Sequence, residues 1–193
     1  MSLAAHRLLT YDEYLDLEQE TRIKHEYVEG IATAMTGGSI THALLVAAVA
    51  AEFRNALKGS SCRVHSSEQR LLLGDDLHRR AYYPDLSVTC GPIPVHPDDR
   101  HAISEARYLV EVLSPNTTRY DTVHKANEYR KIPSLKAFWC VSAREIHIFG
   151  WRRKGQGEWV PTFHGPQNYL PLGDDRRVEV RDIYDGIPLD SHG

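Results

Sequence analysis

The segment from Leu109 to Leu113 constrains the fold most, because it is an almost wholly apolar run with one carboxylate, Glu111, in its middle. A short run of this kind is normally a strand that is buried on both faces in the centre of a sheet. An ionised carboxylate buried without a partner costs several kcal/mol, so Glu111 requires a neutralising group. Two such groups remain open from this argument, namely a divalent cation and a salt bridge.

Asp85 is the second carboxylate in an unusual place. It follows Tyr82-Tyr83-Pro84 and leads directly into an apolar segment that begins at Leu86. Pro84 restricts the preceding residue to extended geometry, which places Asp85 at the start of a strand. Two carboxylates at matching ends of neighbouring strands form a site of oxygen ligands only, and such a site suits Mg²⁺ or Mn²⁺ better than Zn²⁺.

The first third of the chain shows a helix, a hairpin and a second helix. Residues 10–13 form a capping-box-like start for a short helix that ends near residue 18. Residues 25–35 have the pattern of two strands joined at a Glu29-Gly30 turn. The strongest helix pattern covers about residues 40–57, where helical spacing predicts an apolar face that consists of Leu44, Ala47, Ala48 and Ala51.

The rest of the chain is dominated by strand patterns, which we expect over residues 62–66, 69–73, 83–90, 107–113, 138–142, 145–149, 158–163 and 177–180. One more helix is expected over about residues 118–131, so that strand 107–113, this helix and strand 138–142 form a right-handed crossover. The predicted class is α/β, or α+β, with a central mixed sheet flanked by helices. No repeat or domain boundary interrupts the pattern, and we expect a single domain over residues 1–193.

The formal net charge of −3 excludes a nucleic-acid binder that works by bulk positive charge. Contact with DNA or RNA would need a local basic surface, for which Arg79-Arg80 and residues 151–154 are candidates. Short basic runs of this kind are more often ordinary solvated charges.

Three indications favour the cytoplasm. The cysteines at positions 62, 90 and 140 are odd in number and widely spaced, which argues against both a disulfide framework and a structural zinc site. Residues 1–7 have no long apolar core and predict no signal peptide. The longest apolar stretch, residues 43–51, is far shorter than the roughly 20 residues that span a bilayer, so we expect no membrane contact.

A longer pattern surrounds Glu111. Residues 108–117 read YLVEVLSPNT and are followed by Asp121, Lys125 and Tyr129 and then by Ile-Pro-Ser-Leu at 132–135. This pattern closely resembles the Uma2 family (DUF820) of restriction endonucleases, in the PD-(D/E)xK nuclease superfamily. A looser match covers residues 25–30 and His42, and the resemblance extends from about residue 10 to residue 180. Position 113, two residues after the glutamate, holds leucine instead of the superfamily's lysine.

The resemblance implies a restriction-endonuclease-like core in which the lysine has moved from the strand to the next helix, where Lys125 fits. Asp121, Lys125 and Tyr129 share one helix face at i, i+4 and i+8. Without the family pattern, Asp121–Lys125 would be read as a surface pair worth about 0.3–0.5 kcal/mol. Weaker candidates for ligand, substrate or supporting roles are Glu26, His42 and Gln69.

By analogy with the family, we expect hydrolysis of nucleic-acid phosphodiester bonds, with DNA as the expected substrate. Asp85, Glu111 and the main-chain carbonyl of Val112 would hold one Mg²⁺, for which Mn²⁺ could substitute, and Lys125 would act on the attacking water or the phosphate. We expect a homodimer, because cutting both strands of a duplex needs two sites.

Three other functions remain open. A nuclease fold could bind nucleic acid or a protein without cutting. The chain could be structural or regulatory, with Glu111 paired to a buried Arg or Lys, for which Arg70, Arg107 and Arg119 are the candidates. A third alternative is a hydrolase of small phosphoesters, which would show a closed pocket.

Overall fold

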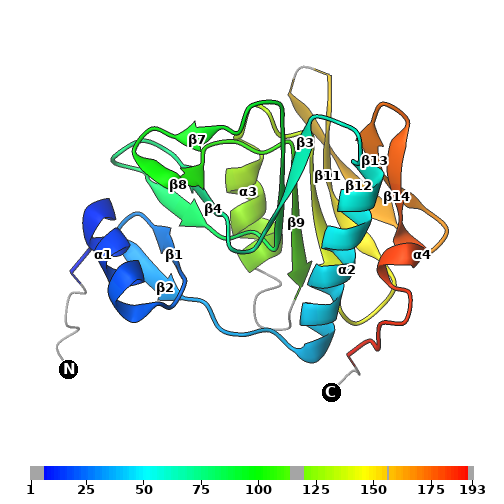
Figure 1. Ribbon diagram of the computed structural model, residues 1–193, viewed down its shortest axis with the longest axis horizontal. Helices are drawn as coiled ribbons and strands as arrows, with labels where there is room; N and C mark the ends of the chain where they lie inside the picture. The colour runs from blue at the N-terminus through cyan, green and yellow to red at the C-terminus, as the bar shows by residue number, and fades with distance from the viewer. Residues whose placement is uncertain (1–6, 114–119, 156, 191–193) are drawn as a thin grey trace.

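A computed structural model describes residues 7–113, 120–155 and 157–190. It confirms a mixed α and β fold, with two six-stranded sheets, a two-stranded sheet and few helices (Figure 1). The strands are β1 (His25–Val28), β2 (Ile31–Ala34), β3 (Cys62–Ser66), β4 (Arg70–Leu73), β5 (Arg80–Tyr82), β6 (Leu86–Cys90), β7 (Val95–His96), β8 (Asp99–Ile103), β9 (Tyr108–Leu113), β10 (Ala137–Ser142), β11 (Ile148–Lys154), β12 (Glu158–His164), β13 (Tyr169–Gly173) and β14 (Arg176–Glu179). The helices are α1 (Tyr11–Thr21), α2 (Ile40–Ala56), the π-helix η1 (Tyr120–Lys125), α3 (Ala126–Tyr129) and α4 (Val180–Ile183).

Sheet B, the strand order β12-β11-β10-β9-β6-β3, contains the central apolar strand that the sequence predicts. All six residues of β9 are buried, as expected for a strand covered on both faces. β9 pairs in parallel with β10, and the other four strand pairs of this sheet are antiparallel. The chain between β9 and β10 passes through η1 and α3, so the predicted strand–helix–strand unit is present.

A second large sheet, sheet A, was not predicted. Its order is β2-β1-β5-β4-β8-β7, and the predicted strand 83–90 is present only as β6, because residues 83–85 connect this sheet to sheet B. β5 ends at Tyr82 in sheet A, whereas β6 begins at Leu86 in sheet B. The intervening Pro84 has no N–H to donate to a ladder, which suits a point where the chain leaves one sheet for the other.

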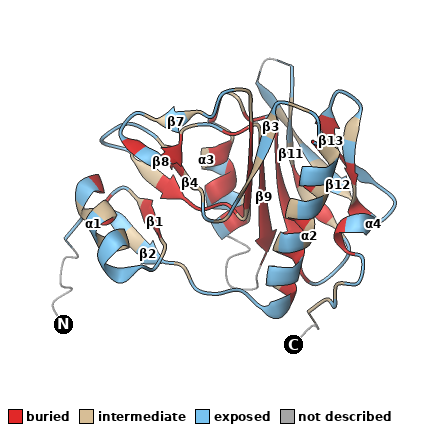
Figure 2. Cartoon of the chain, viewed as in Figure 1, coloured by how far each residue is buried: buried red, intermediate tan, exposed pale blue. Residues whose placement is uncertain are grey.

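The layers follow from three hydrophobic clusters (Figure 2). Helix α1 packs on the outer face of sheet A, and α3 packs between the two sheets. Helix α2, with β13, β14 and α4, covers the opposite face of sheet B. The site built around β9 therefore lies between two sheets rather than at an open sheet edge.

Helix α2 confirms the predicted element but not the predicted face. Its buried residues are Thr41, Leu45, Val49 and Phe53. Leu44 is 40% exposed, and the alanines at 47 and 51 are exposed as well. The larger side chains at i, i+4 and i+8 remove more apolar area from water than the alanines would, and they decide which face packs on the sheet.

The predicted helix 118–131 is present in part, as η1 and α3, whereas its expected start lies outside the described residues. The strand that pairs with β10 begins at Ile148, three residues later than the predicted 145. Within the described residues, no helix is long and apolar enough to cross a membrane.

The prediction that the cysteines form no disulfide is wrong. Cys62 and Cys90 are bonded, with a sequence separation of 28 residues, and Cys140 is a buried free thiol. The two bonded residues are register partners on β3 and β6, so strand pairing brings together thiols that are distant in sequence. The cysteine argument for a reducing cytoplasm no longer holds.

Reduction of this disulfide is expected to lower the free energy of unfolding by about 2–4 kcal/mol, because the crosslink restricts the unfolded chain. Urea denaturation with and without a reductant measures the change. The double variant Cys62→Ser/Cys90→Ser is the control, because the reductant should not affect it. Equal midpoints for oxidised and reduced wild-type protein would contradict the expectation.

Candidate active site

Glu111 points toward the layer between the two sheets. Side chains alternate along a strand, so Leu109, Glu111 and Leu113 share one face of β9. Leu109 and Leu113 belong to the cluster that includes α3, whereas Val110 and Val112 pack with α2 on the other face. Glu111 is only 3% exposed, so it is a buried carboxylate, as the sequence indicated.

Lys125 is the group that neutralises this carboxylate. Its ammonium Nζ lies 3.2 Å from Glu111 Oε1, 2.7 Å from Glu26 Oε1 and 3.1 Å from Asp121 Oδ1. The three carboxylates come from β1, β9 and η1, and therefore from both sheets and the helical layer between them. Of the two expected ways to neutralise Glu111, a salt bridge and a divalent cation, the salt bridge is therefore present.

Tyr129 supports Glu111 from the same helical segment. Its hydroxyl donates to Glu111 Oε1 at 2.8 Å, which is the same oxygen that Lys125 approaches. Asp121, Lys125 and Tyr129 are all buried on one face, as their spacing predicted. Together with Glu26 and Glu111 they form what we call the carboxylate–lysine cluster.

Burial dominates the electrostatics of the cluster. It raises the pKa of Glu111 well above its ordinary value, and Lys125 opposes this shift. The pKa of Glu26 is also raised by burial and lowered in part by Lys125. Burial alone would lower the pKa of Lys125, but the surrounding carboxylates outweigh it and raise that pKa well above the ordinary value. The charged form of Lys125 is therefore favoured, and three carboxylates contact this one ammonium.

Asp85 lies beside the cluster, immediately before β6, the strand that pairs with β9. Its Oδ2 accepts a hydrogen bond from the main-chain N–H of Val112 at 2.7 Å, and His42 Nε2 is 3.4 Å from the same oxygen. Since Leu86 pairs with Val110, the antiparallel register brings the start of β6 next to the end of β9. The two carboxylates that the sequence singled out thus lie on neighbouring strands at the same end of sheet B.

His42 is placed by the N-terminus of α2, where Ser39 Oγ accepts from the His42 N–H at 3.1 Å. The hydrogen bond to Asp85 raises the pKa of the His42 imidazole, and partial burial opposes this shift. The protonated, cationic form is therefore favoured beside Asp85.

Gln69 does not take part in the cluster. Its side-chain amide donates to the carbonyls of Arg70 and His101, at 3.1 and 2.9 Å, and it connects β4 with β8 in sheet A. The sequence placed it near the site because it opens a strand, but that strand belongs to the second sheet.

Arg70, one of the predicted alternative partners of Glu111, is engaged elsewhere. Its guanidinium contacts Asp99 and lies 3.5 Å from Glu18, and its Nε donates to the Tyr83 hydroxyl at 2.9 Å. This network ties α1 to sheet A. Arg119, another predicted partner, lies outside the described residues.

The donor set suits a hard divalent cation by its chemistry, because carboxylate oxygens exceed the cationic groups around them. Within the described parts of the chain, the cationic partners of Asp85, Glu111, Glu26 and Asp121 are Lys125 and His42. Among the described residues, no three side chains of His, Cys, Asp or Glu are spaced to hold one ion. The expected ligands are the carboxylates of Asp85 and Glu111 and the main-chain carbonyl of Val112. This set does not need three side chains of those types.

A cavity of about 310 Å³ reaches the cluster from solvent. Its walls include Glu26, Asp121 and Lys125, together with residues 33–36 and Tyr120. The sequence analysis missed Tyr120, which lies 5.8 Å from Lys125 Nζ, measured to the ring centroid. No spacing signal could have found it, because its position beside the lysine depends on how η1 packs.

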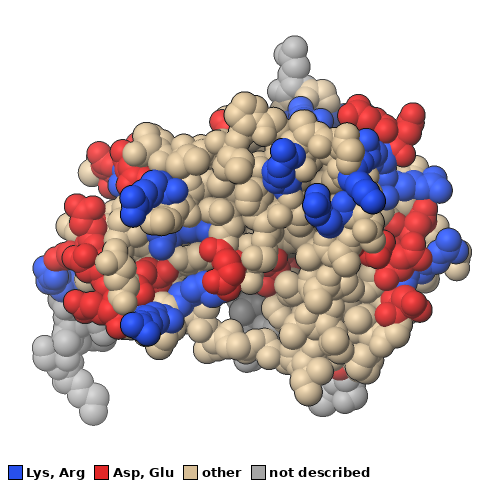
Figure 3. Space-filling model, viewed as in Figure 1, with Lys and Arg blue, Asp and Glu red and all other residues tan. Residues whose placement is uncertain are grey.

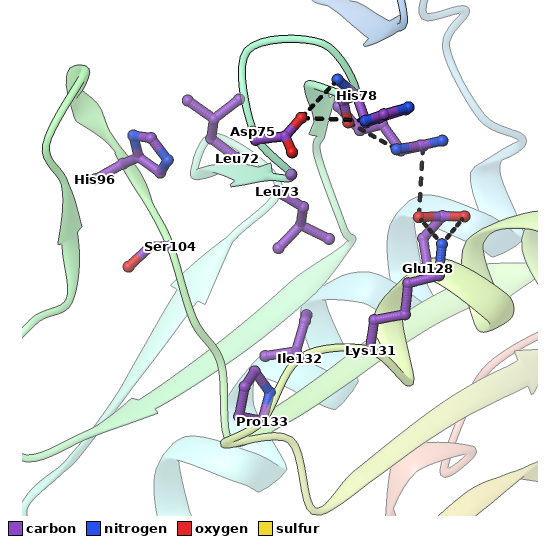
Figure 4. Close-up of a pocket in the computed structure, with 12 residues that line it drawn as sticks. Leu72, Leu73, Asp75, His78, His96, Ser104, Glu128, Lys131, Ile132 and Pro133 are labelled. Atoms are coloured by element: carbon purple, nitrogen blue, oxygen red, sulfur yellow. Dashed lines mark hydrogen bonds and ion pairs between the residues drawn. The ribbon is translucent and has the colours of Figure 1, made fainter.

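A larger cavity, of about 430 Å³, lies elsewhere and contains none of the predicted site residues (Figure 4). Its charged groups pair with one another, since Lys131 and Arg80 both contact Glu128, and His78 contacts Asp75. Leu72, Leu73 and Ile132 form its apolar lining. Catalytic sites are marked by titratable groups with shifted pKa values and by an excess of one charge. The cavity of about 310 Å³ beside Lys125 has both features.

The basic runs offered as a nucleic-acid surface are largely engaged within the chain. Arg79 pairs with Asp76 and Asp98, and Arg80 contacts Glu29 and Glu128. Arg153 donates to the carbonyls of residues 130, 132 and 135. The interpretation of these positions as ordinary charges is therefore the better one.

With the geometry established, comparison with known proteins identifies the family. The model of the Uma2 family, described as a putative restriction endonuclease, matches residues 11–180. The chain belongs to the Uma2 family. The Uma2 match includes every residue of the cluster, together with Asp85 and His42.

Two Synechocystis sp. proteins are similar to this Uma2 chain. The uncharacterized protein slr1290 is 33% identical over 185 residues, which are 93% of each chain. The uncharacterized protein sll1609 is 23% identical over 162 residues, or 84% of this chain and 90% of the relative. A crystal structure of a putative nuclease belonging to DUF820 from Anabaena variabilis is 19% identical, with a TM-score of 0.75, over 93% of this chain and 99% of that one. The last similarity shows that the two chains share a fold.

Proposed function

We propose that this Uma2 protein is a metal-dependent endonuclease that hydrolyses phosphodiester bonds of DNA. The observation that carries the proposal is the convergence of Lys125 with Glu111, Glu26 and Asp121 beside the Asp85–His42 pair. Two buried carboxylates with raised pKa values, Glu26 and Glu111, beside a buried ammonium at the end of a cavity are typical of a catalytic site. The family and the fold support nuclease chemistry at this place.

In this proposal, Asp85, Glu111 and the Val112 carbonyl would hold one Mg²⁺, for which Mn²⁺ could substitute. Bound there, the ion would lower the pKa of a water and neutralise charge on the phosphate. Tyr129 and Lys125 both bind Oε1 of Glu111, which fixes the orientation of this carboxylate. Lys125, held by Glu26 and Asp121, presents an ammonium that orients the water or stabilises charge on the phosphate. His42, in its cationic form, can meet a second phosphate oxygen.

The first test is Asp85→Asn. The Asn side-chain oxygen can still accept the Val112 N–H, so the variant should fold with wild-type stability within about 1 kcal/mol. Metal-dependent cleavage should fall by about 100-fold or more, because one carboxylate charge is lost. Supercoiled, linear and single-stranded DNA, each with Mg²⁺ or Mn²⁺, are the substrates, and the products are expected to carry 5′-phosphates and 3′-hydroxyls.

Asp182→Asn is the matched control, because Asp182 is half exposed and its ion-pair partner among the described residues is its neighbour Arg181. It should cleave at the wild-type rate. An Asp85→Asn protein that cuts as fast as wild type would remove Asp85 from the site and the proposed mechanism with it.

One observation favours a second candidate function, a structural or regulatory protein in which Glu111 pairs with a buried Arg or Lys. Lys125 already neutralises Glu111, so the cluster is held together within the chain by its own charges. Metal-independent retention of DNA, with no cleavage under Mg²⁺ or Mn²⁺, would instead favour a nuclease fold that binds nucleic acid without cutting, and neither retention nor cleavage would favour the structural role.

The assembly and the location are further expectations. A homodimer would supply two sites for the two strands of a duplex. Sedimentation with and without DNA measures the number of chains. The cytoplasm is the expected compartment, and fractionation of cells that express the protein tests it.

A further inference from the structure

In the part of the chain that the structure describes, a restricted opening leads to the cluster. The side chains of Lys125, Glu111 and Asp121 are 6%, 4% and 5% exposed, so a phosphate must enter a cavity to meet them. The cavity over them has a volume of about 310 Å³, which is on the scale of one small ligand. To react here, a duplex would have to place a phosphate inside the cavity while the base of that nucleotide stays paired with the other strand.

One wall of the opening carries no charged side chain among the described residues. One side consists of Thr33 and Ala34 at the end of β2, the edge strand of sheet A, followed by Met35 and Thr36. Small polar and apolar side chains of this kind can contact a sugar or a base edge. They offer no cations for the phosphates on either side of the one that is cut.

Duplex DNA requires such cations. It carries one negative charge per roughly 1.7 Å of its axis, and its affinity comes mainly from Lys and Arg contacts to phosphates. Among the described residues that line this cavity, Lys125 is the one Lys or Arg, and three carboxylates surround it. On the face shown in Figure 3, Lys and Arg side chains alternate with Asp and Glu at the left of the view and gather at its upper right.

The remaining wall is aromatic. Tyr120 is 37% exposed and borders the cavity, with its ring centroid 5.8 Å from Lys125 Nζ. Stacking of bases on aromatic side chains is the principal way in which proteins bind single strands, because every base has a π-face. A base on this ring would have its phosphate close to the ammonium.

We propose that the cavity receives one unpaired nucleotide of a DNA strand, with the base on Tyr120 and the phosphate at Lys125. The substrate class is thus single-stranded DNA, or a duplex with an unpaired nucleotide. The inference rests on the proposed nuclease function and specifies its substrate. A single-strand substrate also removes the need for two sites in a dimer.

The first experiment compares three substrates of the same sequence, namely a single strand, a perfect duplex and a duplex with a bulged nucleotide, in the presence of Mg²⁺ or Mn²⁺. The single strand and the bulged duplex should be cut at least about tenfold faster than the perfect duplex, since extrusion of a paired base costs a few kcal/mol. Equal rates on all three would overturn this inference and leave the nuclease intact. If no substrate is cut, the proposed function fails as well.

The second experiment measures binding without metal, by fluorescence anisotropy of a labelled single strand. Tyr120→Ala should weaken binding about tenfold, as expected for the loss of one base–aromatic stack, and Tyr120→Phe should retain it. Tyr169→Ala is the matched control, because Tyr169 is 46% exposed and lines a different cavity. Unchanged binding by Tyr120→Ala, or equal losses in Tyr120→Ala and Tyr169→Ala, would contradict the role of Tyr120.

Discussion

Replacement of Lys125 by methionine is expected to lower the free energy of unfolding by about 3–5 kcal/mol near neutral pH. The substitution keeps the length of the side chain but removes the ammonium that Glu26, Glu111 and Asp121 share. Removal of one partner from a buried ion pair leaves uncompensated buried charge, which accounts for the size of the loss. Cleavage should fall by about 100-fold or more, because the phosphate loses its donor.

The pH dependence of this deficit follows from the raised pKa of Lys125. A raised pKa in the folded state means that the ammonium stabilises the fold below its ordinary pKa of 10.5, as long as the carboxylates that raise the pKa are ionised. This stabilisation is lost as the pH rises through the folded-state pKa. At acid pH the carboxylates become protonated, and the difference between Lys125→Met and wild type should shrink.

Lys131→Met is the matched control, because its ammonium also pairs with a glutamate, 2.8 Å from Glu128 Oε1, but its side chain is 66% exposed. Surface pairs of this kind contribute about 0–1 kcal/mol. Urea denaturation of both variants at neutral pH gives the comparison. If Lys125→Met were no less stable than Lys131→Met, Lys125 would not be buried among the carboxylates.

Glu111→Gln is expected to have opposite effects on activity and stability. Cleavage should drop by about 100-fold or more, since the strand loses the carboxylate that is proposed to hold the metal. Stability at pH 8 should rise, because burial makes the ionised form of Glu111 unfavourable and glutamine is neutral. The glutamine oxygen can still accept the hydrogen bond from Tyr129.

The sign of the pH effect is fixed by the direction of the shift. The folded-state pKa of Glu111 is raised above its ordinary value of 4.5. Below pH 4.5, protonated Glu111 therefore makes its full contribution to the free energy of unfolding of the wild-type protein. This contribution is lost as the pH rises toward the folded-state pKa. The advantage of Glu111→Gln should be absent at acid pH and should grow above pH 4.5.

Thermal or urea unfolding across this pH range, without added divalent ions, measures the advantage. Glu52→Gln provides the comparison, because Glu52 is a partly exposed residue of α2 outside the cluster. If Glu111→Gln were destabilised equally at acid and alkaline pH, burial of the ionised Glu111 carboxylate would not lower the stability of the wild-type protein.

Several features of this protein followed from local sequence alone. The apolar run around Glu111 predicted a strand covered on both faces, because only such a strand removes so many consecutive apolar side chains from water. The spacing of Asp121, Lys125 and Tyr129 predicted their common face, because it matches the helical repeat. The Glu29-Gly30 turn and the Thr10 cap were also predictable, since both residues of the turn adopt positive φ and the cap bonds Glu13 within three residues.

Other features were decided by the tertiary structure. The second sheet, the contact of Glu26 with Lys125 and the position of Tyr120 each depend on the packing of segments that are far apart in the chain. The Cys62–Cys90 bond and the buried face of α2 were mispredicted for the same reason. A thiol partner is set by strand register, and a buried helix face is set by which side chains find a complementary surface. The sequence determined that a buried carboxylate needed a partner, and only the packing of two sheets around η1 decided that Lys125 would be that partner.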